Sequence, residues 1–302
     1  MTVLVNVIVT LGMLHVVPAG LRLVDPVRLL RTARLWPLVA APGALCLWLP
    51  RGIAATALAA LYAAACLALA ARAVVRPLRA RSLTPPAIAV ATALVSPSVA
   101  ATALVAERAG YRLFGFDLDI LALTVPHFHF AGFTAALIAG LVCRALGGRA
   151  GTDRLARWAA YSVPAGTLLV LLGYFVDDWA ELLGAVVLTG GMWAVALLTW
   201  REIRPSAGDR STRILLAISA TVLVATMALA LWWAVGEATG IPHPTLTWMA
   251  ATHGLGNALG FALCSLLAWR RLSADPRAAA DRTTTERVTT RRTASDRLET
   301  SP

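Results

Sequence analysis

The sequence predicts an all-α fold, a polytopic transmembrane bundle of about nine helices with the N-terminus outside and the C-terminus in the cytoplasm. Three observations lead to this prediction. First, 58% of the residues are hydrophobic and only 14% are charged, whereas soluble domains contain about 25% charged residues. Second, apolar runs of about 20 residues recur along the chain, which is the length that crosses a bilayer. Third, arginines concentrate in every second connection between these runs.

Each expected span is an apolar run bounded by charged or turn-forming residues. The nine runs are residues 3–21, 36–50, 53–73, 86–106, 119–143, 158–176, 179–200, 214–234 and 247–269. The first lacks the basic segment that precedes the apolar core of a signal peptide, so we expect an uncleaved span. The second is short, and the sequence leaves open whether it crosses fully. Its flanking Trp36 and Trp48 favour a span, because tryptophan gathers at membrane interfaces.

The arginines test this division independently, because basic residues concentrate in cytoplasmic connections. Groups of arginines follow the first, third, fifth, seventh and ninth expected spans. Only Arg51, Arg108 and Arg112 lie in the intervening connections. A missed or invented span would break this alternation. All 27 basic residues are arginine, and with the abundant alanine this suggests a GC-rich bacterial genome. We therefore expect a multi-pass protein of the bacterial plasma membrane.

The net charge of +11 could indicate a nucleic-acid-binding protein, which would need its basic residues on one soluble face. Here they lie in short gaps between apolar runs, so we expect the lipid bilayer as partner and no nucleic acid. The oligomeric state is left open. The four cysteines lie in apolar runs without a disulfide or metal-site spacing, and are expected as buried small side chains. They are Cys46, Cys66, Cys143 and Cys264.

Two regions follow from this composition. Residues 1–272 form the expected transmembrane helical domain. Residues 273–302 contain almost no large apolar side chain, so they cannot bury a core and are expected to be a disordered cytoplasmic tail.

Polar and ionisable side chains inside the spans are the candidate functional residues, because they are costly in a membrane. At about 1.5 Å per helical residue, His127 and His129 lie roughly 12–15 Å below the outer end of span five. His253 and Asn257 lie about 10 and 16 Å below the outer end of span nine. Glu181 falls in the first outer turn of span seven. We expect these five side chains to converge on one cavity that opens to the outer side.

Pro126 is the feature expected to bring the two neighbouring histidines together. Residues two apart on a regular helix point about 200° from each other, but proline removes a backbone hydrogen bond and kinks the helix. The alternative is that the histidines only hydrogen-bond across helices as packing contacts, which is the favoured interpretation for His15 near the midplane. The outer acids beside Glu181 (Asp177, Asp178 and Glu237) are expected to be solvated, and His243 to be exposed in a loop.

Two motifs carry a resemblance to a known family. They are "TVPHFHFAGF" at residues 124–133 and "HGLGNALGF" at 253–261, with a weaker match in "PAGLRLVD" at 18–25. Together they resemble the YndJ-like family of bacterial integral membrane proteins, over spans one to nine without the tail. The resemblance implies a multi-spanning fold and brings no settled activity.

The first functional hypothesis is a membrane-embedded enzyme that performs acid/base chemistry (isomerisation, cyclisation or hydrolysis) on a lipid-like or isoprenoid substrate. Histidine changes protonation near neutral pH and suits this role. In a variant of this hypothesis the histidines are ligands of zinc, copper or iron, although the spacing matches no established zinc motif; the cofactor stays open. The alternatives are a transporter or permease for a small or hydrophobic molecule and a non-catalytic scaffold or sensor.

The arginine alternation generates a topology prediction. Reporter fusions after Arg149 and Arg204 should report the cytoplasm, and fusions near Asp178 and Glu237 should report the outside. A reversed signal at any of these positions would break the nine-span model. Residues 36–50 would then be the first segment to re-examine.

Overall fold

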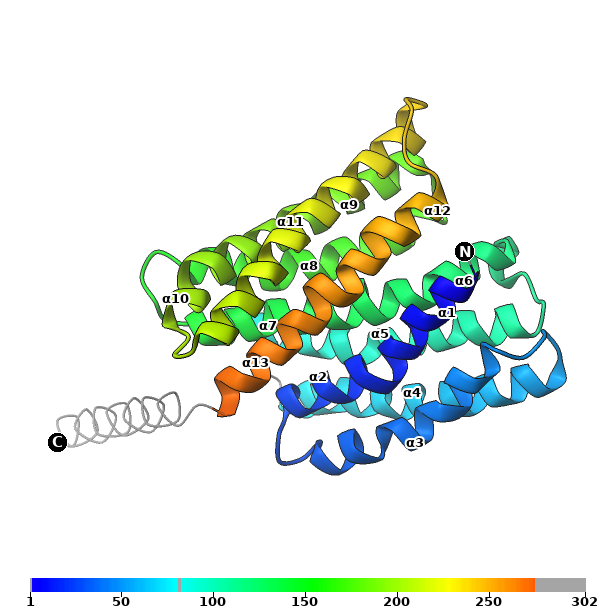
Figure 1. The fold of residues 1–302 in the computed structure, drawn as a ribbon, viewed down its shortest axis with the longest axis horizontal. Helices are drawn as coiled ribbons and strands as arrows, with labels where there is room; N and C mark the ends of the chain where they lie inside the picture. The colour runs from blue at the N-terminus through cyan, green and yellow to red at the C-terminus, as the bar shows by residue number, and fades with distance from the viewer. Residues whose placement is uncertain (1, 81–82, 275–302) are drawn as a thin grey trace.

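The computed structural model describes residues 2–80 and 83–274, and within these ranges it consists of helices and connections without a β-strand (Figure 1). Nine helical passes follow one another in alternating directions. The first four are α1 (Thr2–Leu11) with η1 (Gly12–Val16) and α2 (Val17–Val24), then α3 (Leu30–Cys46), α4 (Ile53–Ala80) and α5 (Pro85–Arg108). After the short η2 (Leu113–Gly115), the fifth pass is α6 (Leu118–His127), η3 (Phe128–Thr134) and α7 (Ala135–Leu146).

The remaining passes complete the bundle. They are α8 (Asp153–Gly173), then α9 (Asp178–Leu198) with η4 (Thr199–Ile203) and α10 (Arg204–Ser206), then α11 (Arg210–Thr239), and finally α12 (Leu246–Met249) with η5 (Ala250–Gly254), η6 (Gly256–Leu263) and α13 (Cys264–Ala274). Eight of the nine passes are long and apolar enough to cross a membrane. The predicted all-α transmembrane fold is therefore confirmed. The predicted disordered tail lies beyond the described residues, apart from Ser273 and Ala274, which belong to α13.

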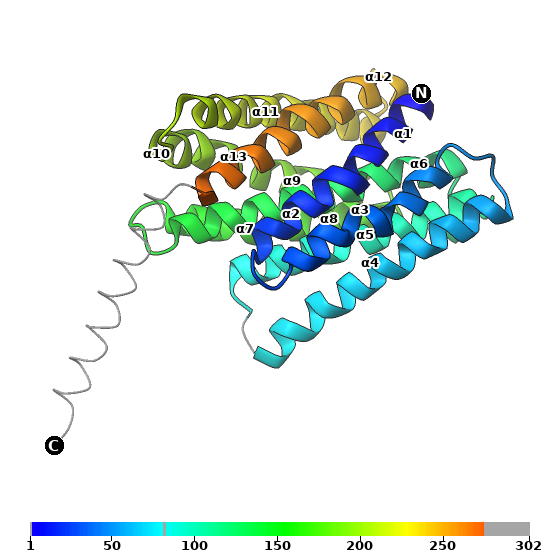
Figure 2. The same ribbon diagram turned by 60° about the horizontal axis from the view of Figure 1, so that its bottom comes forward.

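The second pass, α3, differs from its prediction. It runs beside α2 and α4 (Figure 2), but it begins at Leu30 and has only 17 residues. Trp36 packs inside the bundle: it is 3% exposed, and its indole N–H donates to the carbonyl of Met13 over 3.1 Å. A tryptophan with a buried hydrogen-bond acceptor packs inside a protein as well as it sits at an interface. The helix therefore begins six residues before the expected start of the span, and Trp36 is not one of its terminal residues.

Polar caps set several helix ends on the later passes. The Asp177 carboxylate accepts from the backbone N–H of Ala180 over 2.8 Å and begins α9. Asp209 begins α11 in the same way, accepting from the backbone N–H and the hydroxyl of Thr212. These hydrogen bonds lower the pKa of Asp209. Gly240 ends α11 with a φ of 74°, a left-handed conformation that glycine adopts without strain.

The three arginines that break the alternation are all paired with carboxylates. Arg51 lies 2.9 Å from Glu107, Arg108 also contacts Glu107, and Arg112 pairs with Asp117. Glu107 is 1% exposed, and the Arg108 guanidinium additionally donates to the carbonyls that end α3. These ion pairs connect neighbouring helix ends at one end of the bundle. The other arginine-bearing connections lie at the opposite end, which we call the arginine-rich end.

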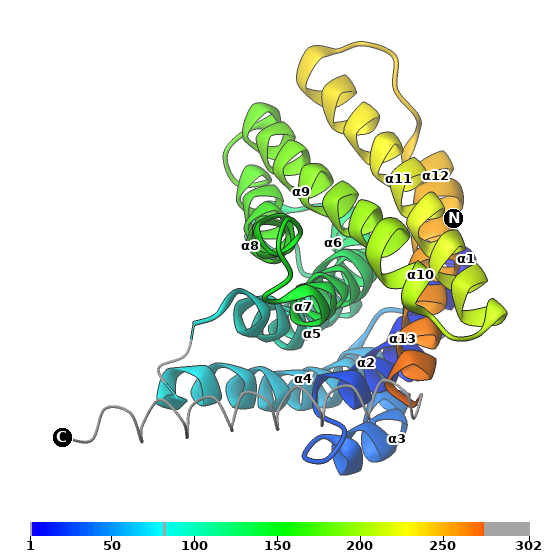
Figure 3. The same cartoon turned by 90° about the vertical axis from the view of Figure 1, so that its left-hand side faces the viewer.

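The fifth pass is the centre of the bundle. In its most apolar window 83% of the residues are buried, against 33–56% in the other membrane-length passes. In Figure 3, α5 and α7 lie between α8 and α9 on one side and α2 to α4 on the other. Small side chains let the neighbours approach: a Cβ atom at Gly20 of α2 would come within 2.5 Å of Phe133 on η3. The central pass therefore positions every element around it.

Helices α8 and α9 form the tightest pair. A Cβ atom at Gly184 would lie 2.4 Å from the backbone nitrogen of Val170, and one at Gly173 would lie 2.4 Å from the backbone nitrogen of Glu181. Gly166 meets the backbone of Leu188 at 2.5 Å. Glycine at these positions lets two backbones touch, which is how helices gain contact energy in a membrane.

Gly184→Ala should destabilise the protein, because the added methyl group meets backbone atoms that cannot rotate away. We expect a loss of about 1–3 kcal/mol, typical of overpacking, measured as a lower midpoint of thermal unfolding in detergent. Gly190→Ala in the same helix is the matched control, since its Cβ would meet only the edge of the half-exposed Trp158 ring at 3.2 Å. Equal midpoints for the two variants would contradict the close packing.

Candidate intramembrane binding site

A cavity of about 250 Å³ lies among α1, α6, α8, α9, α11 and the last pass. Four of the five predicted site residues line it: His127, Glu181, His253 and Asn257. The rest of its wall is mostly aliphatic and aromatic, with further polar contributions from Tyr174 and three threonines. Its size exceeds the engineered 150 Å³ apolar cavity that admits benzene. The cavity can therefore hold a small, largely apolar molecule.

Helix packing explains where the cavity forms. In the half of the bundle near the arginine-rich end, α7 packs directly on α8 and α9. In the half near the N-terminus, α6 packs instead on α1 and α5. The central pass thus fills the space between the outer helices at one end and leaves it at the other. This places the cavity in the half that the topology prediction assigns to the outer side.

The central helix changes its form directly after His127. Pro126 lies in the last turn of α6, and residues Phe128–Thr134 form the π-helix η3. A π-helix has a wider turn with i→i+5 hydrogen bonds and often marks a functional site. The expected local distortion is present. It does not turn both imidazoles to one side, because residues two apart still point in nearly opposite directions.

His129 is the predicted site residue that the structure places elsewhere. It is fully buried, and its Nδ1 lies 2.7 Å from the carbonyl oxygen of Val125, so Nδ1 donates. Its Nε2 then accepts from the Tyr62 hydroxyl on α4, also at 2.7 Å. Gly12 of η1 makes room for the ring, with a would-be Cβ 3.0 Å from the Cβ of His129. The expectation that His129 opens into the cavity is wrong, and the interhelical packing interpretation describes its contacts.

His253 belongs to a closed ring of hydrogen bonds on the opposite wall. Its Nδ1 donates to the carbonyl of Thr226 over 2.8 Å, and its Nε2 accepts from the Asn257 amide over 3.1 Å. The Thr226 hydroxyl donates to the Asn257 side-chain oxygen over 2.7 Å and completes the ring. Gly256 and Gly260 permit this contact between η6 and α11, since a Cβ atom there would meet Thr226 or Val222 within 3.0 Å. Thr226 was missed because a threonine in an apolar run carries no signal of its partner.

Glu181 lies on the cavity wall in the first turn of α9 and is 8% exposed. The Tyr174 hydroxyl interacts with its carboxyl group, and Asp178 and Glu237 add negative charge nearby. Glu237 is not simply solvated, because it pairs with His243 at 3.0 Å. The His243 ring itself packs over Gly236 and edge-on to Trp233. His243 is therefore not the exposed loop side chain that the sequence suggested.

Two polar groups on the cavity wall have no hydrogen-bond partner among the described residues. His127 is partly buried and makes no hydrogen bond there, and the Thr189 hydroxyl is buried and unpaired. The other two wall threonines donate to carbonyls of their own helices. A fully buried hydroxyl without a partner, as at Thr189, is unfavourable by about 1–3 kcal/mol. These two groups are the natural contacts for a molecule bound in the cavity.

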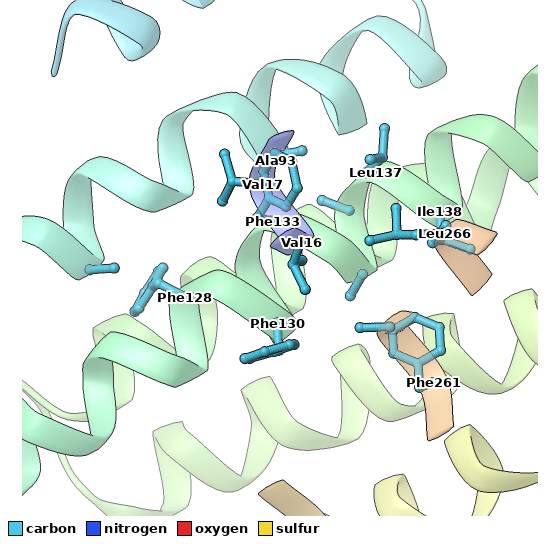
Figure 4. Close-up of a cluster of buried hydrophobic side chains, with 14 of the residues drawn as sticks. Val16, Val17, Ala93, Phe128, Phe130, Phe133, Leu137, Ile138, Phe261 and Leu266 are labelled. Carbon is cyan, nitrogen blue, oxygen red and sulfur yellow. The ribbon is translucent and has the colours of Figure 1, made fainter. Parts of the chain in front are cut away.

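Aromatic rings from both sequence motifs form the inner wall of the cavity. Phe128 and Phe130 come from η3, and Phe261 comes from η6. Figure 4 shows these rings in one apolar cluster with side chains of the first and fifth passes. Each ring is about 95% buried. The two motifs therefore supply both the polar groups and the apolar wall of one site.

In the part of the chain that the structure describes, no group of side chains could hold the metal ion that one variant of the enzyme hypothesis requires. No three His, Cys, Asp or Glu side chains come together there as a metal site would require. Both nitrogens of His129 and of His253 already have partners. His15 lies on the exposed face of η1 without the expected hydrogen bond to another helix.

These features define a multi-pass protein of the cell membrane whose central helix contains a π-helical segment and borders a cavity among the helices. A model of the family described as YndJ-like protein matches residues 7–261, a range that contains both motifs. The chain therefore belongs to the YndJ-like protein family, which confirms the resemblance.

A relative of the chain is an uncharacterized membrane protein, YndJ, from Bacillus subtilis (strain 168). The two are 25% identical over 171 residues, which is 57% of this chain and 30% of the relative. The chain thus aligns with less than a third of the relative's length. No solved structure matches the chain.

Tyr62→Phe should lower stability without changing the cavity. The variant leaves the Nε2 of buried His129 without a donor, which costs about 1–3 kcal/mol. The measurement is thermal unfolding in detergent, with Tyr161→Phe on the exposed face of α8 as control. An unchanged midpoint would mean that the Tyr62–His129 hydrogen bond does not hold α4 to the central pass.

Proposed function

We propose that the protein is a membrane-embedded enzyme that moves a proton on a largely apolar, lipid-like molecule bound in the cavity. The observation that carries this proposal is the pair of unpartnered groups, His127 and Thr189, on an otherwise mostly apolar wall. A ligand with one polar group and an apolar body complements such a wall. A molecule of this kind also partitions into the bilayer that surrounds the protein.

His127 is the group proposed to transfer the proton. Its imidazole has no hydrogen-bond partner among the described residues, so it is free to accept a proton from the bound molecule or return one to it. It lies near enough to His253 that charges on both rings would repel. A neutral His253, held by Asn257 and Thr226, therefore allows His127 to carry the positive charge during the reaction.

Glu181 is proposed as the second titratable group of the reaction. It lines the same cavity and interacts with the Tyr174 hydroxyl rather than with a cation. In an isomerisation, His127 would remove a proton from one atom of the substrate while protonated Glu181 supplies one to another. The proton balance of the substrate then closes without a co-reactant, and return of a proton from His127 to Glu181 restores the enzyme. Asn257 and His253 are positioning residues in this scheme, because their hydrogen bonds are already used within the ring.

A transporter is the second candidate, and the form of the lining helices favours it. Secondary transporters bind their substrates where membrane helices depart from regular α-helical geometry, and here the fifth and ninth passes contain the π-helical segments η3, η5 and η6 at the cavity. Packing of α7 on α8 and α9 closes the cavity toward the arginine-rich end. A transporter would have to separate these helices in a second state.

Substituting His127 should separate binding from chemistry. Liquid chromatography coupled to mass spectrometry of organic extracts from the purified protein should reveal a bound hydrophobic molecule as two separated isomers of equal mass. His127→Gln retains a hydrogen-bonding side chain that cannot accept and release a proton, so its extract should contain a single isomer. Thr189→Val removes one hydrogen bond of about 0.5–1.5 kcal/mol and should weaken retention roughly threefold to tenfold.

Two control variants test whether the same replacements outside the cavity affect the bound molecule through a general loss of structure. His15→Gln and Thr56→Val make the same replacements on exposed faces of the first and third passes. Neither should alter the extract. If His127→Gln extracts contain both isomers at the wild-type ratio, proton transfer by His127 is excluded. Uptake of the molecule into vesicles without conversion would favour the transporter.

A further inference from the structure

A second hollow lies between α5 and α8, on the side of the bundle away from α1 and the last pass. Its volume is about 280 Å³. One wall is a stripe of α5 that includes Ala87, Ala91, Val95 and Val99, and the opposite wall includes the half-exposed Leu168 of α8. We call this hollow the α5–α8 groove.

The groove and the cavity share three wall residues. Phe128, Thr167 and Leu171 line both. Phe128 is the first residue of η3, and its ring packs against Gly132 beside Ser96 of α5. The two hollows are therefore separated by little more than these side chains, with the Phe128 ring between α5 and the cavity.

The groove is almost entirely apolar. No charged side chain lines it, and its hydroxyl-bearing residues are Thr92, Ser96 and Thr167. The Ser96 hydroxyl donates to the carbonyl of Thr92 over 2.8 Å, and Thr167 donates to the carbonyl of Val163 over 2.9 Å. Hydroxyls satisfied within their own helix present mainly carbon to their surroundings. Of the three, the Thr92 hydroxyl has no hydrogen-bond partner among the described residues, so the groove suits hydrocarbon and offers little to a polar headgroup.

We propose that the α5–α8 groove holds the hydrocarbon chain of the substrate and that Phe128 gates its lateral passage into the cavity. From Ala87 to Val99 α5 rises about 18 Å, close to the roughly 15 Å of hydrocarbon in one leaflet. The polar end of the amphiphile then reaches His127 and Thr189, while the chain stays between α5 and α8. This inference rests on the proposed function, because it assigns the polar end to the same site.

A photoactivatable fatty acid tests this assignment. The probe is palmitic acid with a diazirine in mid-chain, added to the full-length protein in phosphatidylcholine nanodiscs, and labelled residues are identified by mass spectrometry of peptides. The exposed residues Ala60, Leu61, Ala64 and Leu67 of α4 report background contact with bulk lipid. We expect α5 residues 87–99 to be labelled about tenfold more than this background, together with cavity residues of η6.

Two variants separate the groove from the cavity. Ala91→Trp fills the groove and should reduce labelling of both α5 and η6 about tenfold. Ala60→Trp is the matched control on an exposed face of α4 and should change neither. Phe128→Ala removes the gate and should speed labelling of η6. If Ala91→Trp does not fold, Leu168→Trp blocks the groove from the exposed α8 side.

The outcomes distinguish the two proposals. Labelling of α5 at the α4 background, or unaffected by Ala91→Trp, would overturn the chain-binding groove. Labelling of η6 that persists at the wild-type rate in Ala91→Trp would overturn lateral passage and indicate loading from the N-terminal end. Strong, Ala91-dependent labelling of α5 without labelling of η6, even in Phe128→Ala, would support the groove and exclude the cavity as the site of the polar end.

Discussion

A proline inside the most buried helix is the constraint on which the rest of this structure depends. Pro126 cannot donate a backbone hydrogen bond, and it lies where the central pass changes from α6 to η3. Beyond this point α7 packs against α8 and α9, and before it α6 turns to α1 and α5. The cavity occupies the space between these two packing arrangements. Its position follows from the backbone of one helix, and its chemistry follows from side chains that several helices supply.

Close glycine contacts make this arrangement stable. At α8 and α9 the backbones of Gly173 and Gly184 touch those of the partner helix, which keeps the outer wall of the cavity rigid. In the last pass, Gly260 leaves room for the Val222 side chain of α11 and so lets these two helices pack closely. Helices in a bilayer gain little from hydrophobic burial, so such contacts and a few interhelical hydrogen bonds must hold them together. The Tyr62–His129 bond is one of these, and it explains why a histidine is present on the side of η3 that faces α4 rather than the cavity.

Much of the fold could be predicted from the sequence, because bilayer thickness and charge placement act on long stretches of chain. The number of passes and most of their bounds follow from apolar runs and from arginine spacing. The start of α3 could not be placed, since a tryptophan looks the same whether it binds a buried carbonyl or lies at an interface. His127 and His253 could be placed in one site from their similar depth along the spans and from the free-energy cost of a polar side chain inside a membrane. The facing direction of His129, the unpaired state of Thr189 and the partners of Thr226 depend on a π-helical turn and on contacts between distant segments, which local sequence does not encode.

The ring of His253, Asn257 and Thr226 can exist in two complete hydrogen-bonding states. In the described state the Asn257 amide donates to His253 and accepts from Thr226. If His253 gains a proton, its Nε2 becomes a donor, and a half-turn of the amide presents oxygen to the histidine and N–H to the threonine. The Thr226 hydroxyl then becomes the acceptor, and it can donate instead to the Leu223 carbonyl, already 3.2 Å away. The ring can therefore take up a proton at His253 by reversing the direction of one amide, while α11 and the last pass keep their positions.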